Sequence, residues 1–256
     1  MEVLVCVKRV PETGGRVSLT ADEQDIDTKF LGFTVSPHEE CAAEEAVRIV
    51  EAHGGSSTVL TLGPEAAADQ LREAMAIGVD RAILLETDGR DWDPVATAGA
   101  IVDAVRAERG GGSDYDLLLF GNEAADSGDY QVGVRVAVAL DLPFIGGVKS
   151  LEIRDGFAVC RRQAAGGWEV FELPLPAVVA VREGINLPRY PSVPGRLRAR
   201  KKEIVRMTPI ARPGGPTKTR LRLPAEQAKS VEILGTGAEA APAVVELLVR
   251  MGLVAP

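Results

Sequence analysis

The first half of the chain alternates short apolar runs with amphipathic segments, and this alternation limits it to a small set of folds. The apolar runs cover residues 3–7, 58–62, 81–85 and 117–120, and each is followed by a segment with helical spacing of its apolar residues. Runs of this kind are typical of strands buried on both faces, as in parallel sheets. We therefore predict an α/β fold with a doubly wound, mainly parallel sheet. Its crevice should lie at the carboxyl ends of the strands.

Three of the helical segments carry recognisable start signals. The sequence Ser36-Pro37-His38-Glu39 predicts a capping box with proline at the first helical position. Asp93-Pro94 predicts the start of a later helix, and a fourth helix is expected from about Asp129 to Leu140.

The pattern changes after Pro143. Alternating segments at 148–153, 157–162, 168–173 and 177–181 predict strands, with Asp155-Gly156 and Gly166-Gly167 as hairpin turns. A proline-rich loop over 183–195, an extended segment over 209–224 and an amphipathic helix at about 242–251 follow. We therefore divide the chain into an α/β domain with a β-hairpin extension, residues 1–200, and an extended C-terminal arm, residues 201–256.

Composition argues against several classes of protein. There are 37 acidic and 29 basic residues, a net charge of −8, which disfavours nucleic acid as a partner. Three scattered cysteines and two histidines do not predict a metal site, and the odd cysteine count favours a reducing compartment, for which we take the cytoplasm. No apolar run approaches the ~20 residues that span a bilayer, so direct membrane insertion is not expected. The patterns GxxxxGK[ST] and GxSxG are absent.

The segment from Gly121 to Gly133 differs from an ordinary connection. It leaves an apolar strand, is rich in small and hydrogen-bonding residues, and enters a helix. Free backbone N–H groups at a helix N-terminus favour a phosphate, and glycine allows its close approach. Because Asp126 and Asp129 are acidic, the backbone would have to supply the contacts. The alternative is a simple loop in which Asp126 or Ser127 caps the helix.

A second unusual segment is the loop from Asn186 to Pro194, which has three prolines and apolar residues at its tip. Proline reduces the entropy lost when such a loop docks on a partner. Arg196, Arg198, Arg200, Lys201 and Lys202 follow as a local basic patch. It is either a solvated strand or turn, or a patch that steers an acidic protein surface.

Several segments together resemble one family, the β subunit of the electron transfer flavoprotein. They are residues 7–13, Ser36-Pro37, residues 42–48, the loop 121–133 and residues 186–190 with the basic stretch behind them. Their order and spacing agree with the family over nearly the whole chain.

The resemblance implies a Rossmann-like domain that binds AMP, in a heterodimer with an α subunit that holds the redox-active FAD. Such a protein carries electrons and has no catalytic residues of its own. It accepts electrons from flavin dehydrogenases, such as the acyl-CoA dehydrogenases of fatty acid oxidation, and passes them to a quinone oxidoreductase or another acceptor. The arm over 201–256 is then expected to pack on the α subunit.

The same resemblance assigns site residues. The cofactor-binding set is Cys6, Ser36, Pro37, His38, Glu39, Leu62, Gly121, Asn122, Glu123, Ala124, Ala125, Asp126, Ser127, Gly128, Asp129, Tyr130, Gln131 and Val132. The partner-recognition set is Pro188, Arg189, Tyr190, Val193 and Arg196, in a recognition loop at about residues 183–200, with Val193 where the family presents a leucine anchor to the dehydrogenase.

Some residues depart from the family pattern. Gln163-Ala164-Ala165 replaces the acidic residues usual before Gly166, which affects the environment of a neighbouring flavin. A subgroup of the family binds a second FAD in place of AMP, oxidises NADH and bifurcates electron pairs, and Gln131-Val132-Gly133 resembles its loop. Gly128-Asp129 stands where that subgroup has Asp-Thr, so we favour AMP.

Overall fold

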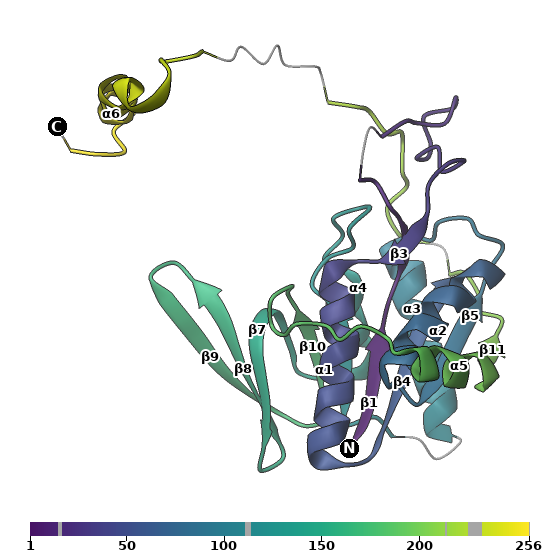
Figure 1. Ribbon diagram of the computed structural model, residues 1–256. Coiled ribbons are helices and arrows are strands. Elements are labelled where there is room, and N and C mark those ends of the chain that lie inside the picture. Colours follow the sequence, from purple (N-terminus) through teal and green to yellow (C-terminus); the bar gives the residue numbers. More distant parts are fainter. Residues whose placement is uncertain (15–16, 111–113, 213, 225–231, 256) are drawn as a thin grey trace. The chain divides into compact units, whose positions relative to one another are not determined.

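The computed structural model describes residues 1–256 apart from residues 15–16, 111–113, 213, 225–231 and 256. The chain divides into two compact units, Met1–Arg220 and Leu221–Pro256 (Figure 1). We describe each unit by itself.

The first unit is built on a nine-stranded sheet with the order β11-β5-β4-β1-β6-β10-β7-β8-β9. Neighbours from β11 to β7 are parallel, and β8 and β9 extend the sheet in antiparallel fashion. The strands are β1 Glu2–Cys6, β4 Ser56–Gly63, β5 Arg81–Glu86, β6 Leu117–Gly121, β7 Phe144–Arg154, β8 Phe157–Ala164, β9 Gly167–Pro174, β10 Ala177–Val181 and β11 Val205–Met207. The predicted α/β fold with a mainly parallel sheet is confirmed.

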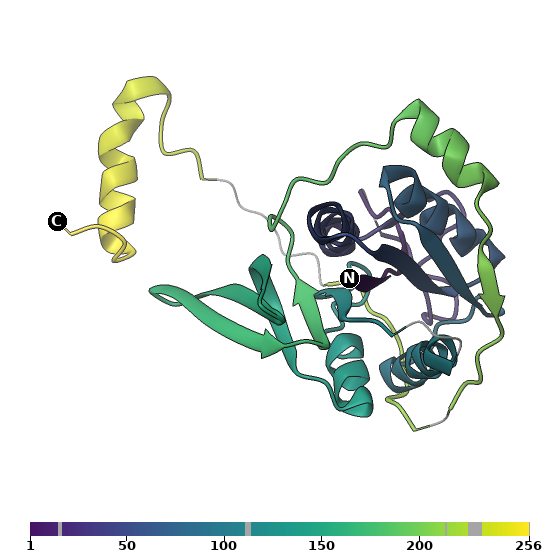
Figure 2. The same ribbon diagram turned by 90° about the horizontal axis from the view of Figure 1, so that it is seen from below.

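Helices cover both faces of this sheet (Figure 2). They are α1 Pro37–His53, α2 Ala68–Ile77 after a 3₁₀ turn at Glu65–Ala67, α3 Pro94–Gly110 and α4 Val132–Leu140. α1 and α2 pack on one face, and α3 and α4 pack on the other. Successive side chains of β1 point to opposite faces of the sheet. Val3 and Val5 pack against α1, and Leu4 and Cys6 pack in the core on the other face. The sheet is therefore doubly wound.

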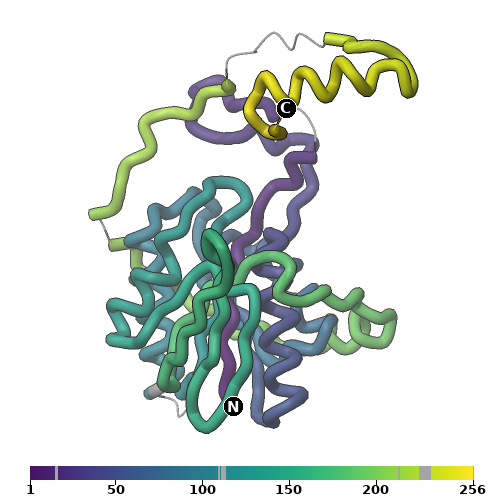
Figure 3. Tube along the Cα trace, turned by 90° about the vertical axis from the view of Figure 1, so that its left-hand side faces the viewer, coloured from purple at the N-terminus to yellow at the C-terminus, as the bar shows by residue number. Residues whose placement is uncertain are grey.

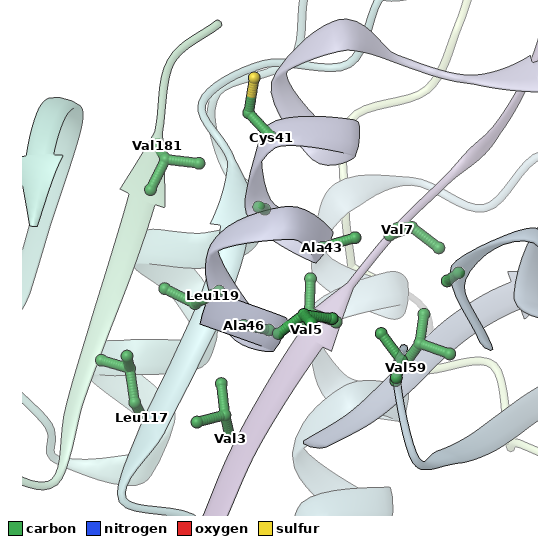
Figure 4. Close-up of a cluster of buried hydrophobic side chains, with 14 of the residues drawn as sticks. Val3, Val5, Val7, Cys41, Ala43, Ala46, Val59, Leu117, Leu119 and Val181 are labelled. Carbon is green, nitrogen blue, oxygen red and sulfur yellow. The ribbon is translucent and has the colours of Figure 1, made fainter. Parts of the chain in front are cut away.

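Small residues bring α1 close to the sheet. Ala43 and Ala46 lie over Val5 of β1 and Leu119 of β6 in one buried cluster (Figure 4). Val5, Leu119 and Ala46 are each 0% exposed. Alanine allows a short distance between helix and strand, and tight packing of this kind fixes the N-terminus of α1 relative to the ends of β1 and β6.

The hairpin turns are close to those predicted. Asp155 and Gly156 have φ angles of 49° and 82°, as a tight turn with two left-handed residues requires. The second turn is formed by Ala165 and Gly166, one residue earlier than predicted, because Gly167 already pairs with Ala164 as the first residue of β9.

The basic stretch is a helix, which corrects the prediction of a loop to residue 195 followed by a strand or turn. α5 runs over Val193–Lys201, and the Ser192 hydroxyl caps it by accepting the N–H of Gly195 at 3.1 Å. α5 packs on α2, where Arg72 Nη1 donates to the carbonyl of Ala199 at 2.9 Å. The cap and the packing on α2 together outweigh the loop signals of the prolines.

A small two-stranded sheet and the extended chain after β11 complete the first unit. β2 (Arg9–Pro11) and β3 (Phe33–Val35) form a separate two-stranded sheet, which Figure 3 shows in purple. The chain after β11 is held by ion pairs, among them Arg212 with Asp103 at 2.7 Å and Lys218 with Asp25 at 2.6 Å.

The second unit contains a 3₁₀ turn, η2 (Gly237–Ala240), and the helix α6 (Ala241–Arg250). α6 matches the predicted terminal helix to within one residue, and none of its residues is buried. Among the residues that the structure describes, no helix is both long and apolar enough to cross a membrane.

Gly195 tests the packing of α5 on α2. A Cβ at this position would lie 2.4 Å from the carbonyl oxygen of Ala76, whereas a Cβ at Gly99 in α3 would meet only the end of the Arg212 side chain at 3.9 Å. We expect Gly195→Ala to lower the free energy of unfolding by about 1–3 kcal/mol through overpacking. Gly99→Ala should leave it unchanged or raise it by up to about 1 kcal/mol. Chemical denaturation of both variants measures this, and equal effects would contradict the assigned close approach.

Candidate functional site

The candidate site lies where β1 and β6 end side by side in the middle of the sheet. The chain leaves β1 through α1 toward β4, and it leaves β6 through α4 on the opposite face. This is the topological switch point at which ligands bind in open α/β sheets. The loop between β6 and α4, residues 122–131, covers this point and is called the switch loop below.

Hydrogen bonds fix the start of the switch loop. The N–H of Asn122 donates to the carbonyl of Val181 at 2.8 Å, and Asn122 Oδ1 accepts the N–H of Gly147 at 2.7 Å. The loop is thereby tied to β10 and β7. The sequence predicted Asn122 as a site residue, but this anchoring role depends on two strands that lie far from it in the chain.

The end of the switch loop differs from the prediction. α4 begins at Val132 instead of near Asp129. Asp129 Oδ1 accepts the N–H of Gln131 at 2.9 Å, and the N–H of Gly128 donates to Ala124 at 2.8 Å. Asp129 therefore stabilises a turn before the helix, because its short side chain can bond to its own backbone two residues on. Tyr130, which follows, is 59% exposed.

Two side-chain contacts hold the switch loop to the end of the first strand and to the first helix. Lys8 Nζ lies 2.6 Å from Asp126 Oδ2, and His38 Nε2 lies 3.4 Å from Glu123 Oε1. His38, Glu123 and Asp126 belong to the predicted set. Lys8 does not, although a charged residue directly after a buried strand could have indicated it.

Glu39 is the buried carboxylate of the site. It is 7% exposed, and its Oε2 accepts the N–H of Lys8 at 2.9 Å. A Cβ on Gly121 would lie 2.5 Å from Glu39 Cγ, so only glycine fits where β6 passes α1. Burial raises the pKa of Glu39 to about 7, against the lowering effect of the hydrogen bond from Lys8. Close packing thus holds this carboxyl directly beneath the switch loop.

The start of α1 corrects the predicted capping box. Pro37 occupies the first helical position and Ser36 is the N-cap residue, but the Ser36 side chain makes no cap hydrogen bond. Its carbonyl accepts the N–H groups of Glu39 and Glu40 instead, and its fully buried hydroxyl lies beside the Glu39 carboxylate, whose pKa it lowers. The capping box is incomplete, because the Ser36 hydroxyl does not accept the N–H of Glu39, while the Glu39 carboxylate interacts both with Ser36 and with the N–H of Lys8.

Cys6 and Leu62 complete the predicted set at the same edge of the sheet. Cys6 is the last residue of β1, and its register partner on β4 is Leu60, two residues before Leu62. Burial, followed by the nearby charge of Glu39, raises the pKa of the Cys6 thiol. Cys6 is therefore a small packing residue here and not a nucleophile.

The arrangement fits a phosphate bound by the backbone. The first N–H groups of α4, those of Val132, Gly133 and Val134, have no partner within the helix. Gly133 is buried, and a Cβ there would lie 3.3 Å from Phe120 Cγ, so the helix start sits close to β6. Within the described part of the chain, no group of three or more His, Cys, Asp or Glu residues could hold a metal ion.

A second surface is formed by the segment before α5. The Arg189 guanidinium donates to Glu44 at 2.9 Å and to Glu51 at 2.7 Å, both on α1, and Asn186 Nδ2 donates to Glu45 at 2.8 Å. The hydrogen bonds to Glu51 and Glu44 raise the pKa of the Arg189 guanidinium above its ordinary value.

The remaining predicted recognition residues lie around this anchor. Tyr190 is 94% exposed and Val193 is 72% exposed, while Arg196 is exposed and Pro188 is partly buried. Leu187, which was not predicted, is 92% exposed. Arg189 is therefore the anchor that holds the segment on α1, and the apolar side chains face outward.

Comparisons with known proteins identify the family of this chain. A family model described as "Electron transfer flavoprotein domain" matches residues 26–211. The chain is 35% identical over 207 residues to the electron transfer flavoprotein subunit beta of Bacillus subtilis, covering 80% of this chain and 77% of that protein. It is 36% identical over 205 residues to the subunit beta of Syntrophomonas wolfei, covering 80% and 78%.

A protein named FixA from Sinorhizobium fredii is 33% identical over 215 residues, covering 82% of this chain and 75% of its own length. The chain belongs to the electron transfer flavoprotein β-subunit family. The predicted resemblance is confirmed.

The buried carboxyl makes folding stability depend on pH. The pKa of Glu39 lies above its unfolded value, so its stabilising contribution is complete below about pH 4.5 and is lost as the pH rises through about 7. Between pH 4.5 and pH 8, we expect the free energy of unfolding of wild type to fall by about 3 kcal/mol relative to that of Glu39→Gln. Denaturation of both proteins across this range measures the difference. A difference that does not change with pH would contradict the buried, titrating carboxyl.

Proposed function

We propose that this chain is the β subunit of a heterodimeric electron carrier, that it binds AMP at the switch loop, and that its α subunit holds FAD. The observation that carries the nucleotide proposal is the cradle formed by Gly121, the switch loop and the first turn of α4, where the N–H groups of Val132, Gly133 and Val134 have no partner within the helix. Membership of the electron transfer flavoprotein β-subunit family supports the proposed heterodimer, the carrier role and the FAD of the α subunit.

Different residues around the cradle would contact the phosphate and the adenosine of AMP. Backbone N–H groups of the switch loop and α4 would hold the phosphate, with the Lys8 ammonium, held by Asp126, as the nearest cation. The ends of β1 and β4 would bound the adenosine. AMP supplies no redox chemistry when bound, so its role would be to stabilise the fold of the subunit.

Electron transfer would depend on the flavin of the α subunit. The three thiols of this chain are buried, and burial raises the pKa of each, to about 12 for Cys160. Protonated, buried thiols are poor redox groups. This supports a carrier role in which the β subunit contributes binding surfaces and no redox group of its own.

Two surfaces would contact partners. The apolar residues of α6, among them Val244 and Val245, are 40% and 56% exposed and fit the role of an arm that packs on the α subunit. Leu187, Tyr190 and Val193, held out by the Arg189 anchor, would dock on flavin dehydrogenases such as those of fatty acid oxidation. The reduced carrier would then pass electrons to a quinone oxidoreductase or another acceptor.

Identification of the bound nucleotides tests the cofactor proposal. The chain and its α subunit, produced together, should release AMP and FAD in equal amounts when the purified complex is denatured. Chromatography of the released nucleotides measures the ratio. Two FAD per complex with no AMP would overturn the proposal and favour the bifurcating alternative to which Gln131-Val132-Gly133 is similar.

Val193 tests the docking surface. We expect Val193→Asp to slow dehydrogenase-driven reduction of the complex by tenfold or more, since a charge would replace an apolar contact at an interface centre, where losses of about 2 kcal/mol are typical. Asp is acceptable at the first position of α5, so the fold should be retained. Ile210→Asp, at a site that is 75% exposed in the segment after β11, is the control. Equal rates for wild type and Val193→Asp would refute the anchor role.

A further inference from the structure

The switch point combines a phosphate cradle with an excess of carboxylates. Glu39, Glu123, Asp126 and Asp129 lie in or beneath the switch loop. Lys8 contacts two of them, through its ammonium to Asp126 and through its backbone N–H to Glu39. An anion that enters the cradle therefore meets negative charge that one lysine does not balance.

Glu39 is the carboxylate least able to avoid such an anion. It is 7% exposed, and its neighbour Gly121 leaves no space, because even a Cβ there would lie 2.5 Å from Glu39 Cγ. The side chain therefore cannot turn outward to water. The Ser36 hydroxyl beside it is fully buried and lowers the pKa of Glu39 by interacting with the charged carboxylate, and a hydroxyl can also accept a hydrogen bond from the protonated form.

We propose that Glu39 takes up a proton when the switch loop binds the nucleotide phosphate, so that nucleotide affinity is linked to pH through this one carboxyl. A phosphate placed over a buried carboxylate strongly disfavours its charged form, and protonation removes the conflict. The inference rests on the proposed nucleotide site and adds a proton to its binding reaction.

The titratable neighbours of Glu39 are less suited to this role. Cys6, at the end of β1, is buried, and its thiol has a raised pKa. Asp126 is paired with Lys8. His38 is held between Glu123 and the N–H of Glu183 after β10. Glu40, the next residue on α1, is exposed to solvent, although partial burial and the charges of Glu73 and Glu183 raise its pKa. Burial raises the pKa of Glu39 to about 7, which allows proton uptake near neutral pH.

Calorimetry of AMP binding tests the proposal. The complex of the full chain with its α subunit, freed of nucleotide, is titrated with AMP at pH 7.5 in HEPES and in Tris, whose heats of ionisation differ. Wild type should take up as much as about three quarters of a proton per AMP, because about a quarter of Glu39 is already protonated at this pH, and Glu39→Gln should take up almost none. Glu40→Gln, the same change on the adjacent exposed residue, is the control and should behave as wild type.

A second measurement does not depend on the variant folding. The dissociation constant of wild type for AMP should be larger at pH 9 than at pH 7, by up to about fiftyfold if Glu39 stays protonated in the complex, and this range lies above the phosphate pKa of about 6. Equal proton uptake in wild type and Glu39→Gln, or an affinity that does not change with pH, would overturn the proposal while leaving the AMP site intact. Absence of AMP binding in the wild-type complex would refute the nucleotide site itself, and the proposal with it.

Discussion

The close approach of α1 to the ends of β1 and β6 is the constraint on which the rest of the structure depends. Alanines on the inner face of α1 allow the helix to lie against Val5 and Leu119. At the carboxyl end of β6, only glycine fits at position 121, because any side chain there would collide with Glu39. The position of α1 then determines where Glu39 and His38 lie beneath the switch loop. α1 also carries Glu44 and Glu51, which hold Arg189. One helix thus supports both the candidate nucleotide site and the candidate docking surface.

This shared support has a physical consequence for function. Hydrogen bonds and tight packing hold the switch loop on the ends of the strands, which would lower the ordering cost of binding the proposed nucleotide there. The candidate docking segment is held on the same helix, because Arg189 makes paired hydrogen bonds to a buried carboxylate of α1. Leu187 and Tyr190 are left exposed to solvent. For the proposed electron carrier, a segment anchored in this way would need little reorganisation when it meets a partner.

Much of the fold could be predicted from the sequence because its elements depend on local pattern. The apolar runs marked the parallel strands, and Asp155-Gly156 marked a hairpin turn. Predictions failed where contacts distant in sequence decided the outcome. α5 forms because Ser192 caps it and α2 supports it, although the prolines around it indicate a loop. The capping box at Ser36 is incomplete, and the Glu39 carboxylate also accepts the N–H of Lys8 at the end of β1, a contact that the local pattern does not contain.

The candidate site was predictable in part for the same reason. The loop composition between Gly121 and Gly133 indicated an anion site, but the role of Lys8 required the pairing of β1 with β6, which no local pattern contains. The most direct test of the account is an experimental structure of the chain in complex with its α subunit and the nucleotide that copurifies. The account predicts a nucleotide phosphate within hydrogen-bonding distance of the backbone N–H groups of the switch loop and the first turn of α4. A nucleotide bound elsewhere on this chain, with the switch loop empty, would contradict it.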